Sequence, residues 1–226
     1  MERKRITLLA GHYGSGKTNI AVNYALMLKS ELDKEGSDFR VAIADLDIVN
    51  PYFRTKDSAD ELEAAGIRLI CSEYAGSNVD IPALPQDIYA ISDDKSMMAV
   101  IDIGGDDRGA LALGRYAPAI LDENDYEMLL VINAYRPLTR DTESTVEVIR
   151  EIENAGGIRF TAIVNNSNLG EETTAQTVLD SLEYAQSIAD AVGLPLKMTS
   201  VREELYDELK DKIKNLFPLK LQEKIK

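Results

Sequence analysis

Short runs of apolar residues alternate with amphipathic segments along most of the chain. Continuous apolar runs of about four to eight residues are typical of parallel strands that are buried on both faces. The segments between these runs carry apolar residues at helical spacing, and several end at a glycine, which predicts helices. The predicted strands cover residues 6–10, 41–44, 67–71, 97–103, 126–133, 159–166 and 194–198, and the predicted helices cover about 20–35, 58–65, 139–155 and 173–192, with a last one from about 201.

This alternation of strands and helices predicts the fold class. It gives an α/β domain with a predominantly parallel central sheet flanked by helices on both faces, a three-layer Rossmann-like arrangement. With 226 residues, a single domain over residues 1–226 is expected. Residues from about 72 to 96 contain Pro82 and Pro85 and predict a loop-rich insertion, and a terminal helix plus tail is expected from about residue 201.

Composition and charge narrow the function classes. The formal net charge of −14 repels nucleic acid at long range, so a nucleic-acid partner is not expected. The sequence has no apolar stretch of membrane-spanning length and no signal-peptide pattern, and Pro218 interrupts its basic tail. A cytoplasmic protein without a membrane partner is therefore expected. One histidine and one cysteine exclude a Cys/His metal cluster, so any metal should be Mg²⁺ held by oxygen atoms.

Residues 11–18, GHYGSGKT, follow the first predicted strand and open the first predicted helix. They complete the pattern G-x-x-x-x-G-K-[ST] of a phosphate-binding loop, or P-loop. Glycines let the backbone turn its N–H groups toward an anion, which the free amides of the helix N-terminus also face. Lys17 would reach the β- and γ-phosphates, and Thr18 would ligate Mg²⁺. The candidate nucleotide-binding residues here are Gly11, His12, Tyr13, Gly14, Ser15, Gly16, Lys17, Thr18 and Asn19.

Carboxylates end two further predicted strands. Asp45 and Asp47 follow the second strand, and the period of two puts both on one face. Asp102 ends the strand at 97–103, which is the expected form of a Walker B segment that positions Mg²⁺. The glycines after it, including Gly105, let the backbone approach a γ-phosphate. Because open α/β sheets bind ligands at the carboxyl ends of their strands, these residues are expected to share one site with the P-loop.

Taken in order, the motifs resemble those of the ParA/MinD-like branch of the P-loop NTPases, which includes nitrogenase iron protein. The resemblance spans nearly the whole chain but is carried by few residues: GHYGSGKT, DLDIVNP, VIDIGGDD, VINAYRP, IVNNSN and LPLKMTS. It implies that Lys17 and Asp47 are catalytic, the latter by orienting or deprotonating the attacking water. It also implies that Thr18, Asp45 and Asp102 surround Mg²⁺ and that Asn165 hydrogen-bonds the purine.

The base that such a site prefers can be argued from residues 165–168. GTP-binding members of the superfamily use N-K-x-D, whereas this chain has Asn-Asn-Ser-Asn, without the lysine or the aspartate. Asparagine amides can pair with the adjacent donor and acceptor of adenine. The sequence therefore favours ATP with Mg²⁺ as the ligand.

Two departures from the resembled branch affect the expected mechanism. ParA- and MinD-type loops carry a second lysine that reaches the nucleotide of a dimer partner, and this chain has His12 there. Because a histidine is mostly neutral near pH 7, the homodimer stays an open alternative. Residues 104–107, Gly-Gly-Asp-Asp, replace a proline-containing switch segment, and the sequence does not decide whether Asp106 and Asp107 approach Mg²⁺ or face solvent.

Three functions remain open from the sequence. The leading hypothesis is a Mg²⁺-dependent ATPase that acts as a nucleotide-driven switch on a protein partner. The second is a small-molecule kinase or ligase of the dethiobiotin synthetase or cobyrinate amidase type, with the segment at about 72–96 as a substrate lid. The third is a non-catalytic ATP sensor, in keeping with the missing signature lysine.

Overall fold

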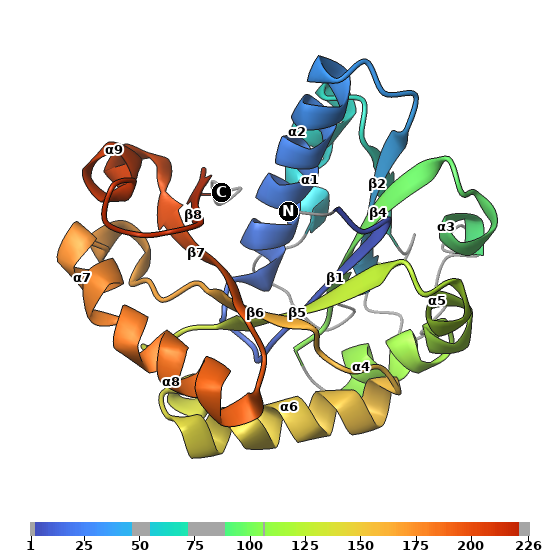
Figure 1. Ribbon diagram of the computed structural model, residues 1–226. Coiled ribbons are helices and arrows are strands. Elements are labelled where there is room, and N and C mark those ends of the chain that lie inside the picture. The colour runs from blue at the N-terminus through green and yellow to red at the C-terminus, as the bar shows by residue number, and fades with distance from the viewer. Residues whose placement is uncertain (1–2, 47–54, 72–88, 106, 222–226) are drawn as a thin grey trace.

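The computed structural model describes residues 3–46, 55–71, 89–105 and 107–221. Its eight described strands form one parallel sheet in the order β3-β2-β4-β1-β5-β6-β7-β8 (Figure 1). The predicted fold class is confirmed, because helices cover both faces of this parallel sheet. The strands are β1 (Ile6–Ala10), β2 (Arg40–Leu46), β3 (Arg68–Ile70), β4 (Met97–Ile103), β5 (Tyr126–Ile132), β6 (Ala162–Asn165), β7 (Leu196–Arg202) and β8 (Leu216–Leu219).

The helices differ in length and in number from those predicted. The predicted helix over residues 173–192 is two helices that meet at the buried Ser181, whose hydroxyl donates to the carbonyl oxygen of Val178 at 2.7 Å. Two helices over residues 107–123 were not predicted. The helices are α1 (Lys17–Lys34), α2 (Ala59–Ala64), α3 (Tyr89–Asp93), α4 (Asp107–Gly114), α5 (Ala117–Glu123), α6 (Thr142–Gly156), α7 (Ala175–Asp180), α8 (Leu182–Val192) and α9 (Tyr206–Leu209).

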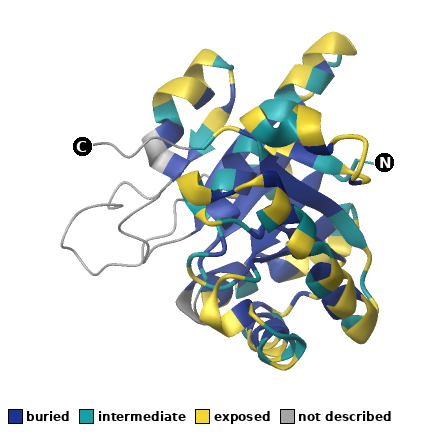
Figure 2. Ribbon diagram, turned by 90° about the vertical axis from the view of Figure 1, so that its left-hand side faces the viewer, coloured by how far each residue is buried: buried dark blue, intermediate teal, exposed yellow. Residues whose placement is uncertain are grey.

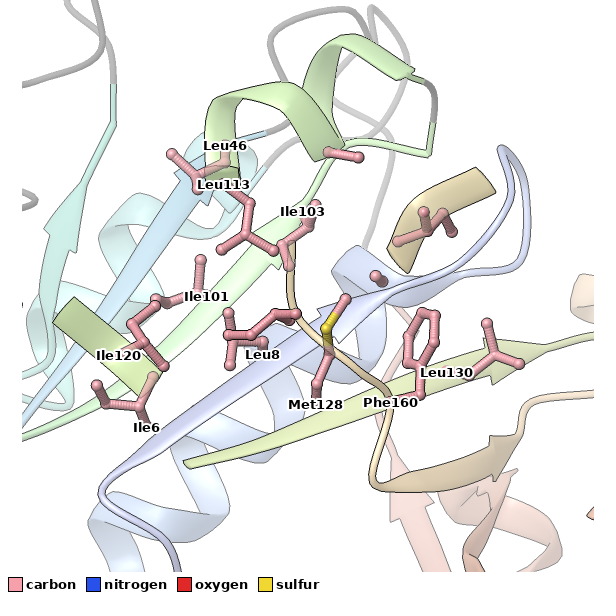
Figure 3. Packing of buried hydrophobic residues seen from close by; sticks show 14 of the residues in the cluster. Ile6, Leu8, Leu46, Ile101, Ile103, Leu113, Ile120, Met128, Leu130 and Phe160 are labelled. Carbon is pink, nitrogen blue, oxygen red and sulfur yellow. The ribbon is translucent and has the colours of Figure 1, made fainter. Parts of the chain in front are cut away.

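The core has two main layers because successive strand residues point to opposite faces of the sheet. Leu8 packs in the layer beneath α4, α5, α6 and α8, whereas Leu9 packs in the layer beneath α1 and α2. Figure 3 shows Leu8 and Met128 of the sheet beside Leu113 of α4 and Ile120 of α5. Figure 2 shows the buried strands enclosed by helices whose outer faces are exposed.

The last part of the described chain forms a strand edge rather than a long helix. Residues 201–202 continue β7, α9 is only one turn, and β8 pairs parallel with β7. The amide of Asn23 in α1 holds the backbone just after β8, since it donates to the carbonyl oxygen of Lys220 at 3.0 Å and accepts from the Lys220 N–H at 2.8 Å. The expected insertion at about 72–96 lies mostly outside the described residues, and its end forms α3. No helix within the described ranges is long and apolar enough to cross a membrane.

A buried ion pair between Arg5 and Glu123 lies at the amino-terminal edge of the sheet. The guanidinium of Arg5 donates to the carboxylate of Glu123 and to the carbonyl oxygens of Ile91 and Met97, at 2.9 and 2.8 Å. Lys95 also donates to Glu123, at 2.7 Å. The hydrogen bond from Arg5, followed by that from Lys95, lowers the pKa of the Glu123 carboxyl below its ordinary value.

We expect Glu123→Gln to destabilise the fold by about 3 kcal/mol at pH 7, because it leaves the buried Arg5 charge without its counter-ion. The lowered folded-state pKa means that this stabilisation is complete above the unfolded-state pKa and is lost as the pH falls through the folded-state pKa. Urea denaturation between pH 3 and pH 7 would test both points. Glu31→Gln is a matched control, since Glu31 lies 3.6 Å from Arg3 in an exposed pair. Equal losses in the two variants would contradict the prediction.

Candidate functional site

The predicted phosphate-binding loop joins β1 to α1 at the carboxyl edge of the sheet (Figure 1). The N–H of Ser15 donates to the carbonyl oxygen of His12 at 3.0 Å, which closes a tight turn. Gly14 and Gly16 have φ of 79° and 86°, in the left-handed region that favours glycine, and Gly16 is the N-cap of α1. The loop therefore has the strand–glycine turn–helix context that the motif requires.

Two neighbouring segments contact the backbone of this loop so closely that the glycines at the contacts cannot be replaced without movement. A Cβ atom on Gly11 would overlap the carbonyl oxygen of Val131 in β5. A Cβ on Gly105, after β4, would lie 2.7 Å from the nitrogen of Tyr13 and 2.8 Å from the carbonyl oxygen of Gly11. Gly105 thus lies against the start of the loop, and its predicted approach to a γ-phosphate stays a prediction.

The polar groups at the start of α1 suit an anion. Lys17 and Thr18 are the first residues of the helix and are 3% and 4% exposed. Beside them the buried hydroxyl of Ser15 has no hydrogen-bond partner in the described part of the chain. A buried hydroxyl without a partner costs free energy, which a ligand oxygen in the loop would recover. The free amides of a helix N-terminus add to this fit.

The two described acids of the predicted site lie side by side. Asp45 of β2 and Asp102 of β4 are register partners on adjacent parallel strands. Val41 and Ile43 of β2 pack beneath α1, as do Met98 and Val100 of β4. Because every second strand residue points to the same face, the carboxylates of Asp45 and Asp102 also lie on the face that α1 covers. Lys17 and Thr18 are the first residues of that helix. Asp102 is fully buried and Asp45 is half-buried.

These residues fit a Mg²⁺ ion that also takes phosphate oxygens. Two carboxylates and the hydroxyl of Thr18 are hard oxygen ligands of the kind that Mg²⁺ prefers. In the described ranges no group of three or more His, Cys, Asp and Glu side chains could hold a metal ion by itself. Asp47 and Asp106 lie outside these ranges, and Asp107 opens α4. Their predicted roles stay predictions.

Asn165 and Asn166 face opposite sides of the sheet. Asn165 is fully buried toward α8, where its amide donates to Ser181 at 2.9 Å and accepts from the hydroxyl of Ser167 at 2.6 Å. Asn166 turns toward the loop and donates to the carbonyl oxygen of Ser15 at 2.6 Å, while it accepts from Ser200 at 2.5 Å. The amide of Asn165 is engaged within the protein in this arrangement, and its predicted contact with a purine stays a prediction.

The remaining predicted loop residues lie around the turn. His12 is half-buried, with Nδ1 3.2 Å from the carbonyl oxygen of Tyr13. Tyr13 is 49% exposed at the surface of the loop. Asn19 is half-buried in the first turn of α1 and accepts from Asn23 at 3.3 Å. These three residues are part of the loop surface, but no ligand contact is assigned to them.

Two residues of the site were not singled out from the sequence. Asn166 holds the loop, and Arg136, in the segment after β5, lies beside Gly14. Asn166 could have been identified from the sequence, because adjacent strand residues face opposite sides of the sheet. Only one of the two neighbouring asparagines can therefore face α1. Arg136 gave no such signal, since it belongs to an irregular segment.

Comparison with known proteins supports the fold. The structure is similar to that of the cell division protein FtsY from Thermotoga maritima, with a TM-score of 0.56, 20% identity, and coverage of 88% of this chain and 62% of that chain. It is also similar to the signal recognition particle receptor FtsY from Elizabethkingia anophelis, with a TM-score of 0.52, 20% identity, and coverage of 92% and 62%. A structure of that receptor in complex with GDP gives a TM-score of 0.50, 18% identity, and coverage of 89% and 58%.

These likenesses establish the α/β fold of P-loop NTPase type. The chain spans about three fifths of the length of the FtsY chains. No protein-family model matches the sequence, and the search of curated proteins also gave no match. The structures named are FtsY proteins, so the ParA/MinD-like branch stays a prediction.

We expect Gly105→Ala to loosen the P-loop, because the added methyl group would push against the backbone of Gly11 and Tyr13. The free energy of unfolding should fall by about 1–3 kcal/mol, and amide hydrogen exchange should accelerate in residues 11–16. Gly36→Ala is the control, because Gly36 has φ of 65° but nothing within 4 Å of the new Cβ. Gly36→Ala should lower the free energy of unfolding through backbone strain, but amide hydrogen exchange in residues 11–16 should not accelerate. Unchanged exchange in Gly105→Ala would show that the close approach is not a constraint.

Proposed function

We propose that this protein binds a nucleoside triphosphate with Mg²⁺ at the loop of residues 11–18 and hydrolyses it. The observation that carries the proposal is the glycine loop itself, which enters an 18-residue helix beside two adjacent strand-end carboxylates. A helix N-terminus with a buried lysine attracts phosphate, and the acids next to it suit the metal that accompanies a triphosphate. These features meet at the edge where parallel sheets bind ligands.

Each residue has a role in this proposal. Lys17 would bind the β- and γ-phosphates and stabilise the charge that develops as the terminal phosphate leaves. Thr18, Asp45 and Asp102 would hold the metal, which neutralises phosphate charge when it is bound. Asp47 would orient the attacking water, as the resemblance implies.

We propose ATP as the preferred nucleotide. Residues 165–168 lack the lysine and aspartate that read guanine, which supports ATP. GTP is the alternative, because one structural neighbour at 18% identity is in complex with GDP. Measuring the affinities for ATP and GTP side by side would decide between them, and a tighter complex with GTP would reject the adenine preference.

We further propose that the nucleotide state is read by a protein partner. Large apolar side chains are exposed in the loops that follow β1, β5 and β6: Tyr13, Tyr135, Leu138 and Leu169. Exposed apolar side chains that gather on one part of a surface are typical of protein-binding sites. A second copy of this chain is one such partner, and the molecular mass in solution with and without nucleotide would test it.

Lys17→Ala should weaken binding of Mg²⁺–ATP by about 100-fold or more, because it removes the buried cation of the loop. Isothermal titration calorimetry would measure this loss. Lys34→Ala is the matched control, since Lys34 is exposed at the far end of the same helix and should bind ATP as the unmodified protein does. Equal affinities in the two variants would reject the loop as the nucleotide site.

Asp47→Asn should lower the rate of ATP hydrolysis by about 100-fold or more, because an amide cannot take a proton from water. The affinity for ATP should stay within about threefold of the unmodified protein, since the loop and Lys17 are unchanged. Phosphate release and ATP binding would be measured on the same preparation. Normal turnover in this variant would reject Asp47 as the water-positioning acid.

A further inference from the structure

We propose that Arg136 is a second phosphate-binding cation of this site, supplied from the segment after β5. The inference rests on the proposed function, because it assigns a further binding residue to the same nucleotide. Four observations carry it: the position of the guanidinium, its lack of a counter-ion among the described residues, the rigidity of its backbone and the hydroxyl of Ser15, which has no partner among those residues.

The guanidinium of Arg136 lies against the middle of the P-loop. A Cβ atom on Gly14 would be 3.4 Å from Cζ and Nε of Arg136 and 3.6 Å from Nη1, so the guanidinium lies within van der Waals reach of that position. Lys17 approaches the loop from α1, whereas Arg136 approaches it from a different segment of the chain.

Arg136 has no counter-ion in the described ranges, and its guanidinium makes no hydrogen bond there. Two other arginines are paired: Arg140 lies 3.5 Å from Asp141, and Arg202 lies 3.6 Å from Glu204. Arg115, Arg150 and Arg159 also lack an ion pair in the described ranges, so it is the position beside Gly14 that distinguishes Arg136. No described acid therefore competes for this charge with an anion at the loop.

The backbone that carries Arg136 is fixed before any ligand binds. The N–H of Arg136 donates to the carbonyl oxygen of Asn133 at 3.1 Å, and its own carbonyl oxygen accepts from the N–H of Thr139 at 3.1 Å. The hydroxyl of Thr139 also donates to the carbonyl oxygen of Asn133, at 2.9 Å. Asn133 and Thr139 are both buried, so the turn between them is anchored. A ligand would have to order only the arginine side chain, which lowers the entropic cost of the contact.

The chemistry of the contact points to the phosphate chain. A guanidinium presents planar donors that match phosphate oxygens, and it keeps its charge at all physiological pH values. The buried hydroxyl of Ser15 next to Gly14 has no partner in the described part of the chain and is a further donor for the same oxygens. A polyphosphate would thus bind between Lys17 and Arg136, with backbone amides and Ser15 between the two cations.

The test compares Arg136→Gln with Arg140→Gln, which removes the same charge from the same segment but from a residue paired with Asp141. Affinities for Mg²⁺–ATP and for inorganic tripolyphosphate would be measured by calorimetry. We expect Arg136→Gln to weaken both by about 10- to 100-fold, the effect of one charge-assisted hydrogen bond or more. Arg140→Gln should stay within about twofold. Arg136→Lys should recover part of the loss, since it restores the charge but not the planar donors.

The remaining outcomes overturn the assignment. Equal affinities in Arg136→Gln and Arg140→Gln would mean that Arg136 only covers the loop. A loss for ATP without a loss for tripolyphosphate would mean that Arg136 contacts the base or the sugar. Thermal unfolding of both variants would show that the fold is kept. If the unmodified protein binds neither probe, the proposed function itself fails, whereas tight binding by the unmodified protein and by Arg136→Gln rejects this inference alone.

Discussion

Close contact between backbones is the constraint on which the candidate site depends. The loop of residues 11–16 must lie against β5, against the segment after β4 and against Asn166 at the same time. Each contact falls on a glycine, because any side chain at Gly11, Gly16 or Gly105 would overlap a neighbour. The glycines therefore serve packing as well as backbone conformation. They allow strand ends that are far apart in sequence to meet at one point on the sheet edge.

The strands and the position of the loop could be predicted because buried parallel strands and a P-loop each have a local signature. The runs at residues 6–10, 97–103 and 126–133 are predominantly apolar, and they form β1, β4 and β5 within one residue of the expected bounds. The juxtaposition of Asp45 and Asp102 followed from the rule that carboxyl ends of parallel strands share an edge. Local patterns were sufficient for these three strands, which are buried on both faces.

Other features depend on contacts that no local pattern shows. The break between α7 and α8 lies at Ser181, a residue that a long helix could have tolerated, and it reflects the hydrogen bond from Asn165 sixteen residues earlier. The tail forms β8 by pairing with β7, and Asn23, in a distant helix, holds the backbone of Lys220 just after it. The position of Arg136 depends on a turn anchored by Asn133 and Thr139. Each of these depends on tertiary packing.

The opposite orientations of Asn165 and Asn166 make the phosphate loop sensitive to strand register. Ala162 and Val164 pack beneath α1, and Ile163 packs on the other face. A slip of β6 by one residue would exchange the two amides, so that Asn165 would meet the loop and Asn166 would meet Ser181. It would also turn the bulky isoleucine toward α1 and put Ala162 and Val164 in its place. The shape of the core therefore determines which asparagine supports the loop. A repacked core could abolish ligand binding at the loop without any change at its surface.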